Sequence, residues 1–316
     1  MEYLMKPYDD ALQEILESGS LRTNQRTGIK TLSIFGMMKR YRLDQSRFPI
    51  LSRRKVWPKS VFAELLWFLS GSTNNKDLKK LGCNFWTPWV DKTFEEKHGF
   101  APGSFGPVYG YQLRHFGGQY GNGIGGQEFT EDDHVVIPCY YRGDLSGSKG
   151  SQINGYGTGG FDQLNWVINR IKEDYSCRRT LWTLWNPQDV PKMRLPPCHM
   201  LTQIFVDDER RLTLTLYQRS LDTPVGCPAN IQFYSALAIM IAQQTDCTPY
   251  EFVHFTGDSH IYENQIEAVK EYLDTPIISS PQLEIKKAKD IFSYNMEDFV
   301  IQDLQSAPKI EIPVAV

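Results

Sequence analysis

The sequence predicts one α+β domain that extends over residues 1–316. Three observations lead to this prediction. The length suits one large domain, and 17 Phe, 16 Tyr and 7 Trp residues supply enough apolar surface for a large core. A very apolar helical segment at 230–245 lies among several strand-like segments, and no linker divides the second half of the chain. Disorder across the whole chain is excluded by the same composition.

The first half alternates helical and strand patterns. Residues 8–18 place Ala11, Leu12, Ile15 and Leu16 on one helical face, and Gly19 follows as a stop signal. Residues 31–35 and 37–43 predict two strands joined at Gly36. The pattern at 60–70 predicts an apolar helix with a single acid, Glu64, which must either pair or take part in chemistry.

Residues 117–160 differ from the rest in composition. They hold more than half of the chain's 24 glycines, interspersed with Tyr, Gln, Asn and Ser. This composition predicts a long surface insertion rather than a core element.

After the insertion the periodic patterns resume. Helices are predicted at 161–174, 230–245 and 262–272, and strands at 179–185, 200–206, 211–218, 252–256, 283–287 and 299–301, before a tail at 312–316.

Composition excludes several classes of protein. The net charge of −3 argues against a general polyanion-binding surface, so no nucleic-acid partner is expected. The longest apolar run, at 236–242, is too short for a membrane span, and the first residues lack a secretory pattern. The six cysteines form no CxxC pair. We therefore expect a cytoplasmic protein with reduced thiols and no metal site.

Cys198 is the candidate nucleophile. It follows two prolines where a predicted strand begins, and Arg219 closes the neighbouring predicted strand, where its charge would lower the pKa of the thiol. The alternative is a small buried hydrophobe, the commonest role of a lone cysteine. His199 is a poor partner for a Cys/His dyad, because adjacent residues on a strand point to opposite faces.

Four arginines are candidates for holding a phosphate dianion. Convergent guanidinium groups bind phosphate in bidentate fashion, whereas scattered ones are ordinary surface charge. No Walker A or GxGxxG pattern is present, which argues against the corresponding nucleotide sites. The four are Arg26, Arg178, Arg179 and Arg219.

Two further polar positions have competing interpretations. Residues 257–262 predict a polar turn from strand to helix, in which His260 and Tyr262 bind a sugar hydroxyl or Asp258 and Ser259 merely cap the helix. Asn230 opens the apolar helix, either as a cap or as an amide that reads the O4 and N3–H edge of uracil.

These residues together resemble the thymidylate synthase family. The resemblance runs from about residue 8 to residue 316, apart from the glycine-rich insertion, and its ordered motifs make chance similarity very improbable. They are Arg26-Thr-Gly28, Ala63-Glu64-Leu-Leu-Trp-Phe-Leu69, Gly106-Pro-Val-Tyr109-Gly110, Arg178-Arg179, Pro197-Cys198-His199, Gln218-Arg219-Ser220-x-Asp222, Pro228-x-Asn230 and Gly257-Asp-Ser-His260-Ile-Tyr262.

The resemblance implies a fold, an assembly and a reaction. A large mixed sheet would pack on the central apolar helix, with the sheet at the interface of a homodimer that shares its sites. Cys198 would add to C6 of dUMP, and 5,10-methylenetetrahydrofolate would give its one-carbon unit to C5, yielding dTMP and dihydrofolate. Glu64 would organise proton transfer through water, and Tyr109 would assist removal of the C5 proton.

The resemblance also assigns residues to each ligand. Catalytic roles would fall to Cys198, Glu64, Tyr109, Arg219, Asp222 and Asn230. The nucleotide would contact Arg26, His199, Gln218, Arg219, Ser220, Asp222, Asn230, His260 and Tyr262, with Arg178 and Arg179 contributed by the other subunit. The folate would contact Glu64, Trp86, Trp89, Leu195, Asp222, Gly226, Tyr262, Val314 and Ala315, and the tail 314–316 would close over the site.

Four positions depart from the usual pattern of the family. Ala229 replaces a Phe, Thr87 an acid, Leu113 a Trp and Gln25 an Asp. Loss of the ring at Ala229 would admit water, and water attack on the exocyclic methylene would give 5-hydroxymethyl-dUMP and tetrahydrofolate. Trp86 and the intact tail favour the synthase. A hydroxymethylase is therefore the alternative function, and a non-catalytic structural or regulatory homologue is a remote one.

Overall fold

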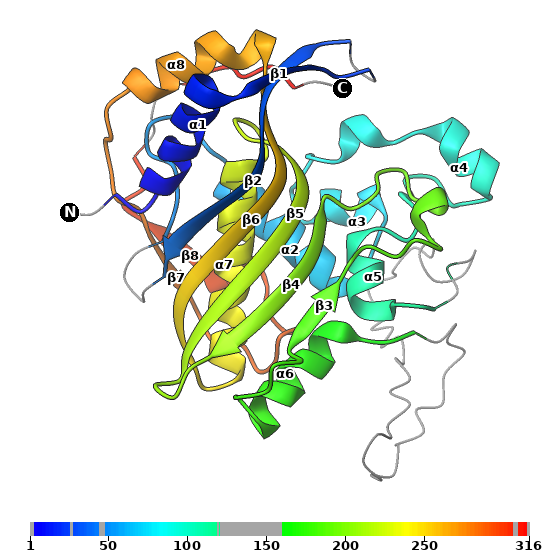
Figure 1. Cartoon of the computed structure of the whole chain (residues 1–316). Helices are drawn as coiled ribbons and strands as arrows, with labels where there is room; N and C mark the ends of the chain where they lie inside the picture. Colours follow the sequence, from blue (N-terminus) through cyan, green and yellow to red (C-terminus); the bar gives the residue numbers. More distant parts are fainter. Residues whose placement is uncertain are drawn as a thin grey trace.

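The computed structural model of the chain (Figure 1) describes residues 3–25, 28–43, 48–118, 120, 160–305 and 309–314. Its main feature is a six-stranded sheet with the order β1-β2-β6-β5-β4-β3. All neighbouring strands are antiparallel except β5 and β6, so the sheet is mixed. The strands are β1 (Ser20–Thr23), β2 (Lys30–Arg42), β3 (Leu181–Thr183), β4 (His199–Val206), β5 (Arg211–Asp222) and β6 (Thr248–Tyr262).

The central helix α7 (Cys227–Gln244) explains the one parallel pair. Parallel strands need a crossover, and α7 is the connection that leads from β5 to β6. It packs against both strands and against α2 (Pro58–Ser70). Almost every side chain of α7 is buried, which accounts for its lack of a polar face. Asn230 is among the few residues of the helix that keep some exposure.

The remaining elements cover the edges and the back of this layer. Helix α1 contacts β2 and β6, and α5 contacts α2 and α6. A two-stranded antiparallel sheet, β7-β8, lies beside α7. These elements are α1 (Lys6–Ser18), α3 (Asn75–Lys80), α4 (Lys92–His98), α5 (Tyr109–His115), α6 (Gln163–Glu173), α8 (Ile266–Asp274), β7 (Gln282–Ile285), β8 (Phe299–Gln302) and 3₁₀ turns at Thr87–Trp89, Val190–Lys192, Glu263–Gln265 and Met296–Asp298.

One face of the large sheet carries exposed apolar side chains. The strand register places Leu201, Tyr217, Phe255 and Met38 side by side across four strands, and each is at least 39% exposed. Phe205 on the same strand as Leu201 is 64% exposed. Figure 1 views the sheet from this side, with α7 and α2 behind the strands. An apolar row of this extent is typical of a protein interface.

The structure corrects two predictions about elements. Gly36 does not separate two strands: β2 runs through it, with Gly36 at φ 87°, a conformation that favours glycine. Residues 257–262 are not a turn, because β6 extends to Tyr262 and the helix begins only at Ile266. The proposed caps at Asp258 and Ser259 are therefore wrong. The predicted glycine-rich insertion falls almost wholly outside the described residues.

Within the described ranges, no helix has the length and apolar character needed to cross a membrane.

Candidate active site

Cys198 and Arg219 meet where β4 and β5 pair. The guanidinium Nη2 of Arg219 lies 3.6 Å from the Cys198 Sγ. The same guanidinium donates to the carbonyl oxygens of Pro196 (3.0 Å) and Pro197 (2.9 Å), which fixes it against the loop that carries the thiol. The backbone N–H of Arg219 donates to the Cys198 carbonyl at 2.9 Å. The positive charge of Arg219 therefore lies beside the half-buried sulfur of the candidate nucleophile.

Tyr109 also contacts Cys198. It is the first residue of α5, and its hydroxyl accepts a 2.8 Å hydrogen bond from the Cys198 backbone N–H. Its ring stacks on Phe68 and meets Trp86 edge to face. Burial raises the pKa of Tyr109 well above its ordinary value, so its hydroxyl keeps its proton at neutral pH.

Glu64 is a half-buried acid next to these aromatic rings. It lies on α2, and the indole Nε1 of Trp86 donates a hydrogen bond to its Oε1. Burial raises the pKa of Glu64 to about 7, although the hydrogen bond from Trp86 opposes that change. A carboxyl group that titrates near neutral pH can both give and take a proton under working conditions.

Three polar side chains, Gln218, Asn230 and His254, are joined by hydrogen bonds near the end of β5. Gln218 lies on the buried face of the strand, in series with Leu212, Leu214 and Leu216. Its Oε1 accepts from Asn230 Nδ2 at 3.0 Å and from His254 Nε2 at 2.9 Å. Burial lowers the pKa of His254 to about 3, so the ring is neutral. The bonds to Gln218 orient the Asn230 amide at the start of α7.

His199 makes no dyad with the thiol. Its Nδ1 lies 3.1 Å from the Tyr234 hydroxyl, and it also hydrogen-bonds the Asn230 side chain. Burial lowers the pKa of His199 to about 4, so it is neutral and unsuited to stabilising a thiolate. The sequence argument against a Cys/His dyad agrees with this geometry.

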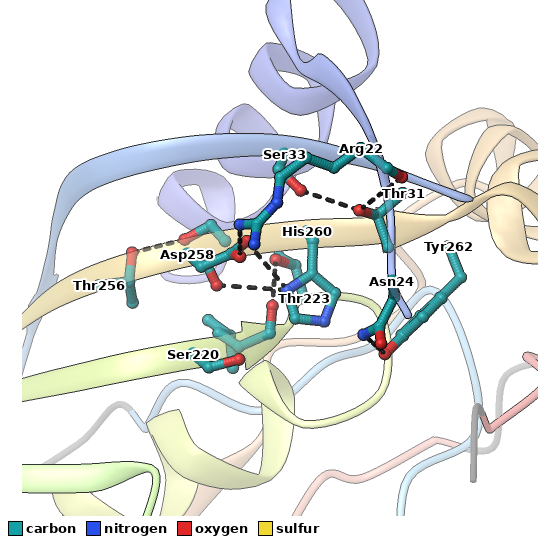
Figure 2. A network of polar contacts seen from close by, with 12 residues as sticks. Arg22, Asn24, Thr31, Ser33, Ser220, Thr223, Thr256, Asp258, His260 and Tyr262 are labelled. Atoms are coloured by element: carbon teal, nitrogen blue, oxygen red, sulfur yellow. Dashed lines mark hydrogen bonds and ion pairs between the residues drawn. The ribbon is translucent and has the colours of Figure 1, made fainter. Parts of the chain in front are cut away.

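The ends of β5 and β6 bring the sugar-binding candidates together. Their parallel register pairs Ser220 with Asp258 and Asp222 with His260. Gly257 permits this approach, because a Cβ there would lie 2.6 Å from the Arg219 carbonyl oxygen. Figure 2 shows His260 beside Asp258 and Tyr262. The Asn24 side chain donates to the Tyr262 hydroxyl at 3.4 Å.

Asp222 connects the site to the C-terminal tail. Gln265 Nε2 donates to both carboxylate oxygens, at 3.2 and 3.1 Å, and to the Pro313 carbonyl at 2.8 Å. Burial raises the pKa of Asp222 above its usual value, against the hydrogen bonds from Gln265. Gly226, the N-cap position of α7, donates its backbone N–H to the Asp222 carbonyl at 2.8 Å. Gln265 therefore holds Pro313, at the start of the C-terminal tail, close to Asp222.

The remaining predicted site residues are exposed, half-buried or outside the described part of the chain. Arg178 and Arg179 are exposed in the turn before β3, and among the described residues neither guanidinium group has a hydrogen-bond or ion-pair partner. Trp89 and Leu195 are half-buried against the core, and Val314 is 56% exposed. Arg26, Ala315 and Val316 lie outside the described residues.

The surroundings of three of the four positions that depart from the usual family pattern are as follows. Leu113 is buried in the core. Thr87 Oγ1 accepts a 3.4 Å hydrogen bond from Asn75. Ala229 is half-buried against the core.

The sequence did not single out His254, Gln265 and Arg22, which hold Gln218, Asp222 and Asp258 in place. The signal for His254 was a lone polar ring inside an apolar strand pattern at 252–256; the other two gave none. In the described part of the chain, no three His, Cys, Asp or Glu side chains are arranged to hold a metal ion.

The site thus combines a thiol beside an arginine, Cys198, with an oriented amide, Asn230, and two acids, Glu64 and Asp222. Such a site defines an enzyme for covalent chemistry on a polar ligand.

Comparisons with known proteins agree. The sequence profile of thymidylate synthase matches residues 6–316. Over 313 residues, 98% of this chain, the identity is 38% to a thymidylate synthase of Herpesvirus ateles and 39% to that of Homo sapiens, covering 97% and 90% of those proteins. It is also 38% to a bifunctional dihydrofolate reductase-thymidylate synthase of Zea mays, of which the chain spans 54%. The chain belongs to the thymidylate synthase family, whose co-substrate is 5,10-methylenetetrahydrofolate.

Proposed function

We propose that the chain is a thymidylate synthase that converts dUMP to dTMP. The observation that carries the proposal is the Cys198 sulfur held 3.6 Å from Arg219, on the strand end that also orients Asn230. The geometry suits a thiolate that attacks C6 of a pyrimidine whose O4 and N3–H edge is read by an amide.

The chain's own residues perform the following steps. The Cys198 thiolate forms a bond to C6, which leaves C5 nucleophilic. Asn230 accepts from N3–H and donates to O4, so charge that develops on the base is stabilised. Glu64, with a pKa of about 7, passes protons to and from the base through water. Tyr109 stays protonated beside Cys198 and positions the acceptor of the C5 proton.

The co-substrate supplies the methylene group that bonds to C5 and then the hydride that reduces it, leaving dihydrofolate. Loss of the thiolate from C6 restores the double bond and frees dTMP. Trp86, Trp89 and Leu195 would contact the folate, and Asp222 would hydrogen-bond its pterin. The tail, anchored through Gln265 at Pro313, would exclude water once both substrates are bound.

The proposed assembly is a homodimer formed through the open face of the sheet. The exposed row of Leu201, Tyr217, Phe255 and Met38 supports this interface. Arg178 and Arg179 would reach across it to the partner's nucleotide phosphate, which is also held by Arg26, Arg219 and Ser220. Their exposure, without partners among the described side chains, supports that role.

The decisive experiment is incubation with dUMP and methylenetetrahydrofolate, followed by mass identification of both products. We expect dTMP and dihydrofolate. Hydroxymethyl-dUMP with tetrahydrofolate would replace the synthase with the hydroxymethylase. Turnover of dCMP in place of dUMP would contradict the role of Asn230, and absence of any product would favour a non-catalytic homologue.

A further inference from the structure

We infer that Asp258 and Arg22 are positioning residues that fix the tautomer of His260, so that its Nε2 accepts a hydrogen bond from the 3′-hydroxyl of the nucleotide. This inference rests on the proposed function, because it takes the ligand to be a deoxynucleotide. It assigns roles to two residues that touch neither the base nor the phosphate. Through them, the protein decides that His260 accepts the hydrogen bond from the 3′-hydroxyl and does not donate it.

The contacts form a continuous chain. The Arg22 Nη1 lies 2.6 Å from the Asp258 Oδ2, and the Asp258 Oδ1 lies 3.3 Å from the His260 Nδ1. The backbone carbonyl of Asp258 is also 3.3 Å from that nitrogen. Figure 2 shows these contacts, which lead from Arg22 on β1 to Asp258 and His260 on β6.

Both atoms that face the His260 Nδ1 can only accept hydrogen bonds. In a neutral imidazole one nitrogen carries the hydrogen and the other is an acceptor. The acceptors around Nδ1 therefore place the hydrogen there and leave Nε2 as the acceptor. A sugar hydroxyl, which can donate, fits this nitrogen, whereas an ether oxygen or a carbonyl does not.

Asp258 is suited to orienting His260 because its carboxylate stays charged and is held by Arg22. The pKa of its carboxyl is below the ordinary value, chiefly because His260 hydrogen-bonds to it, with Arg22 and Ser33 adding to the effect. The side chain of Arg22 is 66% exposed and that of Asp258 is 25% exposed. An ion pair this exposed contributes little to folding, so its removal should affect the orientation of Asp258 and His260 more than stability.

The test compares dUMP with its 3′-deoxy analogue, 2′,3′-dideoxyuridine monophosphate. Wild-type enzyme should prefer dUMP by about tenfold in kcat/KM, the value of one hydrogen bond. Asp258→Ala should remove most of that preference by raising the KM for dUMP, with little change for the analogue. Arg22→Ala should act in the same direction, by about twofold to threefold. Asp258→Asn, which keeps an acceptor at Oδ1, should retain most of the preference.

A double-mutant cycle with His260→Ala tests whether Asp258 acts through His260. In that background the hydrogen bond from the hydroxyl to His260 is already lost, so adding Asp258→Ala should not change the preference further. Lys39→Ala is the matched control, because it removes another partly exposed ion pair, with Glu14 at 2.9 Å, that involves neither Asp258 nor His260. It should leave the preference at its wild-type value.

The outcomes separate this inference from the proposed function. If wild-type enzyme turns over dUMP but Asp258→Ala and Arg22→Ala lower kcat/KM equally for both nucleotides, the residues are only structural and the inference is wrong. If Asp258→Ala does not fold, Arg22→Ala and Asp258→Asn decide the question. If wild-type enzyme neither binds nor converts dUMP, the proposed function fails and takes this inference with it.

Discussion

Glu64→Gln should change how the free energy of unfolding depends on pH. Burial raises the pKa of Glu64 from 4.5 to about 7, so the folded chain binds this proton more tightly than the unfolded chain. The stability that the protonated acid contributes is fully present below about pH 4.5 and is lost as the pH rises through 7. The difference between these pKa values corresponds to a loss of about 3 kcal/mol at high pH.

Glutamine keeps the size of the acid and an oxygen that accepts from Trp86, but it cannot ionise. The variant should therefore gain stability relative to wild type as the pH rises from 5 to 8, by up to about 3 kcal/mol. The assay is urea unfolding at pH 5, 6, 7 and 8, at one protein concentration because the proposed dimer makes stability concentration-dependent.

Glu17→Gln is the matched control, since it replaces an exposed carboxylate of α1 with the same amide. Trp86→Phe adds a second measurement. It removes the hydrogen bond that opposes the effect of burial, so the loss of stability should move to higher pH. Parallel curves for wild type and Glu64→Gln between pH 5 and 8 would refute the reasoning, because they would mean that Glu64 titrates alike in both states.

Other consequences concern the nucleophile, the assembly and the base. Cys198→Ala should lower turnover more than about 1000-fold, whereas Cys177→Ala should retain it; normal activity of the first variant excludes the covalent mechanism. Mixing Cys198→Ala with Arg179→Ala should restore part of the activity, because one site of the heterodimer carries neither defect; no recovery after proven subunit exchange would indicate self-contained sites. Asn230→Asp should lower kcat/KM for dUMP about 100-fold or more and favour dCMP, and an unchanged base preference would show that Asn230 does not read the base.

Local pattern was sufficient for most elements. The helices at α1, α2, α6 and α7 and the strands β4 and β5 were predicted within a few residues, because their apolar spacing is strong. Gly36 misled the prediction because glycine marks both turns and strand irregularities. Residues 257–262 were misassigned because they are polar. Their strand conformation is stabilised by pairing with β2 and β5, which lie far away in the sequence.

The sequence by itself determined the chemical groups of the site and the family to which they belong. Cys198, Arg219, Asn230 and Glu64 could be proposed from residue type, neighbouring prolines and an acid in an apolar helix. Tertiary structure alone decided their relationships: which groups meet, which acid is desolvated and which side chain fixes another. Trp86 reaches Glu64, and Arg22 reaches Asp258 across 236 positions of the chain. Distances and burial depend on the packing of the whole chain, and no local pattern records them.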